Sequence, residues 1–309
     1  MRAFLDRIRT RITHFADIQV QRYLPRVYAR WPAFVLLTRL NKPIGTYLLL
    51  WPTLGALWLA ADGIPDWHLI VIFALGTFLM RSAGCCINDY ADANIDGDVL
   101  RTQNRAIVTG QVTRKEAMAC FIGLCLAAFI LLLFTNMLTI WMSLGAVALT
   151  ALYPFMKRYT HLPQVVLGMA FSWGILMAFT AQTGEFPPTT AWLLYVANCL
   201  WTVAYDTQYA MVDREYDLKI GVKSTAILFG DADRVMIGAL QVMFLFALLL
   251  AGGQFQMAGI YYLGLLVAAG LLVYQQWLIR DRDTAACFRA FLNNHWVGLA
   301  VFAGVVSGV

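Results

Sequence analysis

Nine long apolar runs divide this 309-residue chain, and shorter polar gaps separate them. Each run is close to the roughly 20 residues that an α-helix needs to cross the hydrocarbon core of a bilayer. The pattern therefore predicts nine transmembrane helices. Their predicted ranges are 43–61, 67–87, 116–135, 137–156, 163–182, 190–209, 234–252, 257–278 and 287–308.

Lys and Arg residues favour alternate gaps between these runs. The N-terminal segment and every second gap contain them, whereas the gaps 61–67, 134–137, 182–190 and 252–256 contain none. Cytoplasmic loops of membrane proteins are enriched in Lys and Arg. We therefore predict a cytoplasmic N-terminus and a C-terminus on the other side of the membrane.

The composition also indicates an integral membrane protein with the lipid bilayer as its surroundings. Hydrophobic residues make up 60% of the chain and charged residues 13%, whereas a soluble domain has about 25% charged residues. The net charge of +5 follows from the loop pattern, so we expect no nucleic-acid partner. The six cysteines and four histidines show no metal-binding spacing.

A basic segment precedes the first run. Phe4, Ile8 and Ile12 recur at helical spacing among arginines, which is typical of an amphipathic helix on an anionic membrane surface. A disordered basic tail is the alternative. We therefore divide the chain into a basic amphipathic N-terminal segment, residues 1–36, and a nine-helix transmembrane domain, residues 37–309.

The first of two acid clusters follows the second apolar run. Asn88, Asp92 and Asp96 are spaced at i, i+4 and i+8, so a helix that continues from the run would align them in one column. Stacked like charges repel one another, and burying them at a membrane edge is costly. A cation would offset both costs, and Mg²⁺ binds carboxylates together with phosphate oxygens.

The second acid cluster lies at the end of the sixth run. Asp213 and Asp217 are again four residues apart, and Asp206 lies two turns before Asp213 on the same helical face. Both clusters are predicted on the same side of the membrane. Two acidic faces could therefore flank one cavity and hold Mg²⁺ with a diphosphate between them. The alternative is that both clusters are solvated charges at helix ends.

Several further residues near the clusters could neutralise a diphosphate, although the topology alone also explains basic residues there. Tyr153 and Lys157, four residues apart, could reach the same phosphate oxygens. Arg81 lies inside the second run, two turns before Asn88, where an arginine is costly without an anion. It could pair with an aspartate or bind an anionic acceptor. The other candidates for charge neutralisation are Arg101, Arg105, Lys219 and Lys223, and Asp89 is a further candidate for substrate binding.

At these residues the chain resembles the UbiA family of intramembrane prenyltransferases. Segment 88–96 is similar to the family's NDxxDxxxD motif, segment 213–217 to its DxxxD motif, and segment 153–157 to its YxxxK motif. Segments 42–45 and 205–214 are similar to bacterial members that prenylate 4-hydroxybenzoate in ubiquinone biosynthesis. The resemblance covers the chain beyond the N-terminal segment.

The resemblance implies nine helices around a central cavity. It implies transfer of a polyprenyl group from polyprenyl diphosphate to the ring carbon ortho to the hydroxyl of 4-hydroxybenzoate, with Mg²⁺ as cofactor. The protein would lie in the bacterial inner membrane, with its active site on the cytoplasmic side. Arg81 and Asp206 match residues that flank the acceptor, Arg39 being the alternative for its carboxylate. The metal and diphosphate ligands would be Asn88, Asp92, Asp96, Asp213 and Asp217.

The chain also departs from the family pattern. Ala106 and Val108 stand where prolines are usual, and Glu215 and Tyr216 replace acids that are often seen there. The first departure bears on the stiffness of a loop over the site rather than on its chemistry.

Two other functions compete with this prediction. A secondary transporter would place ionisable residues near the bilayer midplane on broken helices, whereas these acids lie at the ends of runs and in loops. A prenyltransferase with another acceptor is the closer rival, and segments 42–45 and 206–211 favour 4-hydroxybenzoate.

Overall fold

The computed structural model describes residues 25–94, 97 and 102–309. Over these residues the secondary structure is helical and contains no β-strand, as the sequence predicts. Nine long helices match the nine predicted runs one to one. They are α3 (Ile44–Ala61), α4 (Trp67–Asp92), α5 (Arg114–Leu132), α6 (Met137–Tyr159), α7 (Pro163–Thr183), α8 (Thr189–Ile220), α10 (Asp233–Gln254), α11 (Gly259–Leu278) and α12 (Thr284–Gly308).

Helix α8 departs most from its predicted range, 190–209. It has 32 residues and ends before Gly221, whose φ of 72° forms a left-handed C-cap. The apolar run stops earlier because the helix carries its acid cluster beyond the hydrophobic stretch. In the described part of the chain, eight helices have the length and hydropathy of a membrane span, and α8 is not among them. Its polar residues, such as Asn198 and Gln208, are buried against other helices.

Helix α2 (Pro25–Thr38) precedes the first span and contacts α4. It crosses the predicted boundary between residues 36 and 37. Its Arg30 donates a hydrogen bond from Nη2 to Glu116 Oε2 on α5 at 2.9 Å. The amphipathic helix predicted nearer the N-terminus lies outside the described residues. Three short elements are α9 (Thr225–Phe229), η2 (Gly230–Ala232) and η3 (Ile279–Asp281).

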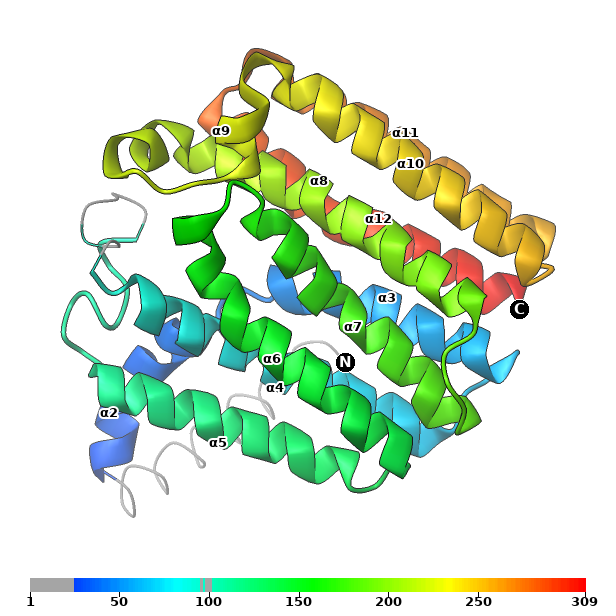
Figure 1. The fold of residues 1–309 in the computed structure, drawn as a ribbon, viewed down its shortest axis with the longest axis horizontal. Coiled ribbons are helices and arrows are strands. Elements are labelled where there is room, and N and C mark those ends of the chain that lie inside the picture. Colours follow the sequence, from blue (N-terminus) through cyan, green and yellow to red (C-terminus); the bar gives the residue numbers. More distant parts are fainter. Residues whose placement is uncertain (1–24, 95–96, 98–101) are drawn as a thin grey trace, which may run out of the picture.

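The long helices lie side by side in Figure 1, and the contacts between them close a ring. Helix α3 packs on α4, α6 on α7, α7 on α8, α8 on α10 and α11 on α12, and α12 returns to α3. Two further contacts, α3 with α7 and α8 with α12, cross the ring. They leave α4, α5 and α6 around a space on one side, whereas α8, α10, α11 and α12 form a packed group on the other.

Amide side chains join the four helices of that packed group. Gln275 of α11 is fully buried and accepts hydrogen bonds from Gln208 of α8 and Gln241 of α10, each at 3.1 Å. It donates to Asn293 of α12 at 3.0 Å. Polar groups inside a bilayer must find partners within the protein, so these bonds fix the register of the helices. The amide network comprises Gln208, Gln241, Gln275, Gln276, Asn293 and Asn294, with the indole of Trp201 bonded to Asn294.

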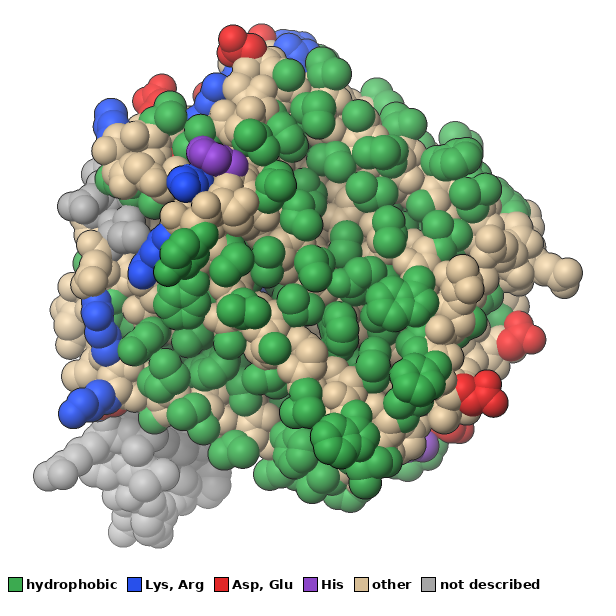
Figure 2. Space-filling model, in the orientation of Figure 1, with side chains coloured by type: hydrophobic (Ala, Val, Ile, Leu, Met, Phe, Trp, Pro, Cys, Tyr) green, Lys and Arg blue, Asp and Glu red, His purple; other side chains and the backbone are tan. Residues whose placement is uncertain are grey.

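The two ends of the bundle differ in charge. Figure 2 shows a broad apolar face between an edge that bears Lys and Arg and an opposite edge that bears acidic side chains. The α3–α4 and α7–α8 connections contain Asp62, Asp66 and Glu185 but no Lys or Arg. We call the other end, where α4, α6 and α8 finish, the basic end. The protein is thus a multi-span membrane protein with an asymmetric charge distribution.

Candidate active site

A cavity of about 1120 Å³ lies inside the ring and reaches the basic end. Its wall comes from α3 to α8, the start of α12 and the loop before α5. Most of the residues predicted from the sequence line it, although they come from distant parts of the chain. These residues are Arg81, Asn88, Asp89, Asp92, Arg105, Tyr153, Lys157, Asp206, Asp213, Asp217 and Lys223.

Asp89 of α4 holds two arginines at the cavity wall. Its side chain is 2% exposed, Arg39 Nη2 donates to its Oδ1 at 2.8 Å, and Arg105 Nη1 lies 3.1 Å from the same oxygen. Burial alone would lower the pKa of the Arg39 guanidinium, but electrostatic attraction by the Cys85 sulfur and the Asp89 carboxylate outweighs burial and holds that pKa above its ordinary value. Arg39 is therefore a permanent cation in the wall.

Asp92, at the end of α4, has one paired and one unpaired oxygen. Its Oδ2 forms an ion pair with Lys157 of α6, and Arg105 Nη1 lies 3.8 Å from the same atom. Its Oδ1 is buried and has no hydrogen-bond partner among the described residues. A buried acceptor without a partner costs about 1–3 kcal/mol. Because this carboxylate lines a large cavity, a bound cation is the partner that its chemistry favours.

The end of α6 is tied to both acid-bearing helices. Arg158 donates a hydrogen bond to the backbone carbonyl of Ala91 on α4. Lys223, which follows α8, donates its backbone N–H to the carbonyl of Lys157 at 3.0 Å and its ammonium to the carbonyl of Tyr159 at 3.2 Å. The cavity-facing side chains of α6 are therefore fixed between the two acid clusters.

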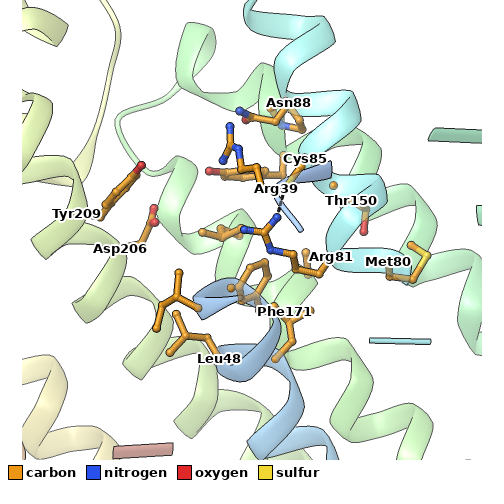
Figure 3. Close-up of a pocket in the computed structure, with 18 of the residues that line it drawn as sticks. Arg39, Leu48, Met80, Arg81, Cys85, Asn88, Thr150, Phe171, Asp206 and Tyr209 are labelled. Atoms are coloured by element: carbon orange, nitrogen blue, oxygen red, sulfur yellow. Dashed lines mark hydrogen bonds between the residues drawn. The ribbon is translucent and has the colours of Figure 1, made fainter. Parts of the chain in front are cut away.

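The second acid cluster faces the same cavity from α8. Asp206, Asp213 and Asp217 all line it, as does Tyr209 one turn after Asp206. In Figure 3, Asp206 and Tyr209 lie across the cavity from the labelled residues of α4. The fold therefore brings described residues of both predicted acid clusters to the wall of one cavity.

A buried ion cluster around Asp233 links the acidic part of α8 to neighbouring elements. Asp233, at the start of α10, has no exposed surface, and Arg214 Nη1 of α8 lies 3.4 Å from its Oδ2. Arg282, before α12, donates to the same carboxylate at 2.8–3.1 Å. Its hydrogen bonds with Asp233 raise the pKa of Arg282 above its ordinary value. The cluster joins the acid-bearing end of α8 to the start of α10 and to the residues before α12.

Arg81 lies deeper in the cavity, against α3. Its guanidinium donates to the Cys85 thiol (Figure 3) and lies 3.4 Å from the carbonyl of Thr38, and it forms no ion pair with a described carboxylate. A Cβ added to Gly45 would lie 2.5 Å from Arg81 Nε, so glycine is needed for this close approach. A buried arginine without an ion pair is costly in a membrane, and an anionic ligand would offset that cost.

The structure also separates some predicted residues from the site. Lys219 does not line the cavity, and its ammonium lies 5.6 Å from the ring centroid of a tyrosine on its own helix. Asp96 and Arg101 lie outside the described residues. Tyr209 lines the cavity but was not selected from the sequence, although its position three residues after Asp206 places it on nearly the same helical face.

The oxygen donors of the cavity suit a hard cation that binds together with phosphate. Within the described ranges, no three His, Cys, Asp or Glu side chains converge as a preformed metal site. Instead, Asp92 of α4 and Asp213 and Asp217 of α8 all line the one cavity. Mg²⁺ takes one or two carboxylates and completes its shell with water and phosphate oxygens, so these residues fit the ion. The unpartnered Oδ1 of Asp92 is one available ligand atom.

Comparison with known sequences gives close relatives over almost the full length. The 4-hydroxybenzoate octaprenyltransferase of Pseudomonas aeruginosa (strain LESB58) is 60% identical over 284 residues, which cover 92% of this chain and 96% of that protein. The protein of the same name from Pseudomonas syringae pv. syringae (strain B728a) is 59% identical, with the same coverage.

Solved structures share the fold at lower identity. A UbiA homolog from Aeropyrum pernix K1 has a TM-score of 0.76 and 22% identity, and the match covers 85% of this chain and 97% of that one. A UbiA homolog from Archaeoglobus fulgidus bound to GPP and Mg²⁺ has a TM-score of 0.61 and 17% identity, with coverage of 89% and 99%. The model of the UbiA prenyltransferase family matches residues 49–298, and this chain therefore belongs to that family.

Proposed function

We propose that this protein transfers a polyprenyl group from polyprenyl diphosphate to 4-hydroxybenzoate, at the ring carbon ortho to the hydroxyl, as an Mg²⁺-dependent step of ubiquinone biosynthesis. Its relatives at 60% identity carry the name 4-hydroxybenzoate octaprenyltransferase. The coverage of 92% of this chain and 96% of the relative supports carrying the whole activity over.

One observation in this molecule carries the proposal. The acid-bearing ends of α4 and α8 face one cavity whose deeper part is apolar, and a buried carboxylate oxygen of Asp92 lacks a partner there. A diphosphate with bound cations and a long apolar tail has the same division between charged and apolar parts. A soluble phosphate ester would not use the apolar part.

Asn88, Asp92, Asp213 and Asp217 would hold the metal and, through it, the diphosphate. When bound, Mg²⁺ supplies positive charge that stabilises the diphosphate as it leaves. The homolog from Archaeoglobus fulgidus bound to GPP and Mg²⁺ supports this assignment by its shared fold. Lys157 and Arg105, already paired with Asp92, would contact the same phosphate oxygens.

The reaction breaks the allylic C–O bond, and the diphosphate leaves with the bonding electron pair. Lys157 and Arg105 stabilise the charge that develops on the leaving group. The ortho carbon of the acceptor then supplies the electron pair for the new C–C bond. Asp206 accepts the phenolic hydrogen and raises the electron density of the ring. The ortho carbon then loses its proton to the departed diphosphate, and Asp206 returns the phenolic hydrogen, so that the aromatic phenol is restored and Asp206 is again a carboxylate.

Arg81 would bind the carboxylate of the acceptor. It is the cavity arginine without an ion pair to a described carboxylate, whereas Arg39 is engaged by Asp89. An acceptor held by Arg81 lies across the cavity from Asp206 (Figure 3). In 4-hydroxybenzoate the hydroxyl lies para to the carboxylate, so one molecule can contact Arg81 at one end and Asp206 at the other.

The charge asymmetry supports a cytoplasmic placement of the site. Lys and Arg gather at the end where the acid clusters lie, and such residues favour the cytoplasmic face. We place the protein in the bacterial inner membrane with its N-terminus inside. A periplasmic reporter fused after Val309 should be active, and a reporter fused in the Lys219–Lys223 loop should not be. The reverse result would overturn the orientation.

Product formation tests the activity. Purified protein with Mg²⁺, ring-labelled 4-hydroxybenzoate and a polyprenyl diphosphate should give a prenylated benzoate, and EDTA should abolish its formation until excess Mg²⁺ is added. Undiminished turnover in EDTA would refute the metal role. Absence of the product under all conditions would refute the function.

A second experiment isolates the acceptor site. Arg81→Gln should raise the KM for 4-hydroxybenzoate by about tenfold or more, because one charged hydrogen bond contributes about 1.5–3 kcal/mol. A phenol without the carboxylate should lose little with the same variant. Arg280→Gln, at an exposed arginine stacked on Trp277, serves as the matched control. Equal losses for both acceptors would place the carboxylate elsewhere.

A further inference from the structure

The cavity continues past Arg81, away from the basic end, as an apolar arm. Helix α4 lines it with Ile72, Gly76 and Met80, which recur every four residues. Helices α3, α5, α6 and α7 supply the other walls, and no described Lys, Arg, Asp or Glu lines this part. In Figure 3, Leu48 and Phe171 lie on the side of Arg81 that is remote from Asn88. We call the part of the cavity between the levels of Arg81 and Ile72 the apolar arm.

The hydroxyl groups around the arm do not make it polar. Thr53, Ser143 and Thr150 each donate to a carbonyl of their own helix at 2.7–2.8 Å. Their donors are therefore used, and methyl or methylene groups remain to face the space. Near the end of the bundle opposite the basic end, Thr139 and Thr180 join α6 to α7 at 2.9 Å. The arm therefore runs between packed helices.

The dimensions of the arm fit a few isoprene repeats. Ile72 and Arg81 are nine residues apart, which is about 13.5 Å along a helix at 1.5 Å per residue. Each repeat adds four C–C bonds of about 1.5 Å, so its extended length is below about 6 Å. The arm therefore accommodates at least two repeats beyond the level of Arg81.

Gly76 keeps the middle of the arm open. It lines the cavity, and a Cβ added there would meet no atom within 4 Å. A larger side chain at this position would project into the arm without displacing backbone. By contrast, a Cβ on Gly174, across the arm, would lie 2.8 Å from Thr53 Oγ1. Gly76 is thus the position where side-chain size alone sets the free space.

The proposed function places the donor tail in the apolar arm, and we propose that Gly76 determines how long a tail the enzyme accepts. This inference rests on the proposed function. The arm is continuous with the site of the diphosphate at Asp92, because one cavity contains both. A donor whose diphosphate lies at the acid clusters therefore extends the first repeats of its tail into apolar surroundings. A lipid acyl chain is the rival occupant.

Distances along α4 predict which donors a substitution at Gly76 affects. The residue lies five positions before Arg81, or about 7.5 Å further into the arm. With the first repeat at the level of Arg81, the second repeat of a geranyl donor ends before Gly76. The third repeat of a farnesyl donor passes it, as do all longer tails.

The experiment compares Gly76→Ala, Gly76→Leu and Gly76→Phe with geranyl, farnesyl and longer prenyl diphosphates as donors. The kcat/KM for geranyl diphosphate should stay near that of the unsubstituted enzyme, whereas the value for farnesyl and longer donors should fall by at least about tenfold with Leu. The loss should grow from Ala to Phe. Gly270→Leu, at an exposed helical glycine with no atom within 4 Å of an added Cβ, is the matched control and should leave the donor profile unchanged.

The outcomes separate the two proposals. If the unsubstituted enzyme prenylates 4-hydroxybenzoate with none of the tested donors, the proposed function is refuted. An active enzyme whose donor profile is the same in Gly76→Leu refutes the role of the arm and leaves the function standing, as expected if a lipid fills the arm. Activity of Gly76→Leu with geranyl diphosphate also shows that the variant folds.

Discussion

The amide network and the charged part of the cavity both bury polar side chains within the helical bundle, but they differ in how their bonds close. In the network, Gln275 uses its oxygen twice and its nitrogen once, each time with another side-chain amide. In the cavity, Asp92 pairs one oxygen with Lys157, while the other has no partner among the described residues. The first set is complete within the protein, whereas the second is completed by a ligand.

This difference separates stability from activity. A closed set of hydrogen bonds inside a membrane holds helices in register, because each group that loses its partner has no water to replace it. A buried carboxylate oxygen without a partner lowers the stability of the folded protein. Asp92 has such an oxygen in the wall of the cavity, where a cation can bind. Helix α8 takes part in both, since Gln208 belongs to the network and Asp206 lines the cavity.

The largest expected effect is on activity, at Asp92. Asp92→Asn keeps the shape of the side chain but removes the charge that binds a cation and balances Lys157. We expect kcat to fall by about 10²-fold or more, while the thermal unfolding midpoint of the protein changes little. Asp62→Asn, at the opposite end of the bundle, is the control. Retained turnover in Asp92→Asn would contradict the contrast between the two regions.

The next effect is on stability, at the centre of the network. Gln275→Leu removes three hydrogen bonds, so Gln208, Gln241 and Asn293 each lose the bond that they form with Gln275. We expect the free energy of unfolding in detergent to fall by about 2 kcal/mol, with kcat per folded molecule within about twofold. Gln254→Leu, at an exposed position at the end of α10, should change neither quantity. A large loss of kcat in folded Gln275→Leu would show that the network serves catalysis.

A smaller effect is expected where packing positions a charge. Gly45→Ala places a methyl group against Arg81, which must move because the added Cβ would lie 2.5 Å from Nε. We expect the KM for 4-hydroxybenzoate to rise by roughly tenfold, about 1.4 kcal/mol, with a smaller change in kcat. Gly123→Ala on α5, where an added Cβ meets nothing within 4 Å, is the matched control. An unchanged KM would mean that Arg81 does not contact the acceptor.

The smallest expected effect is the coupling between the two regions. A cycle of Asp92→Asn, Gln275→Leu and the double variant should give additive changes in unfolding free energy, within about 0.5 kcal/mol. The two side chains share no hydrogen-bond partner. A coupling well above that value would mean that α8 transmits strain between the network and the cavity.

The sequence predicted the helices and most of the cavity wall because both follow simple periodicities. The ranges of α3 and α6 differ from prediction by three residues or fewer at each end. The spacing of four residues placed Asp213 on the same face as Asp217, and both line the cavity. The length of an apolar run and the spacing of residues on a helix are local properties, so both can be predicted from the sequence without knowledge of the tertiary structure.

Pairing between helices could not be predicted in the same way. Nothing in the sequence indicates that Asp89 holds Arg39 and Arg105 rather than a substrate, because these three residues meet only after the chain folds. The amide network was also missed, since isolated Gln and Asn within apolar runs look alike whether they face lipid, a cavity or a neighbouring helix. Lys219 was selected by its nearness in sequence, but its helical position turns it away from the cavity.

Helix α8 extends about 48 Å, at 1.5 Å for each of its 32 residues, whereas a bilayer core measures about 30 Å. One continuous helix therefore carries both the packing contacts of Gln208 and, further towards its C-terminal end, the acids Asp213 and Asp217. Inserting one residue after Gln208 would rotate Asp213 by about 100° away from its companion wall. The site therefore depends on the exact number of residues between Gln208 and Asp213, whereas a change in the length of a surrounding loop leaves this spacing intact.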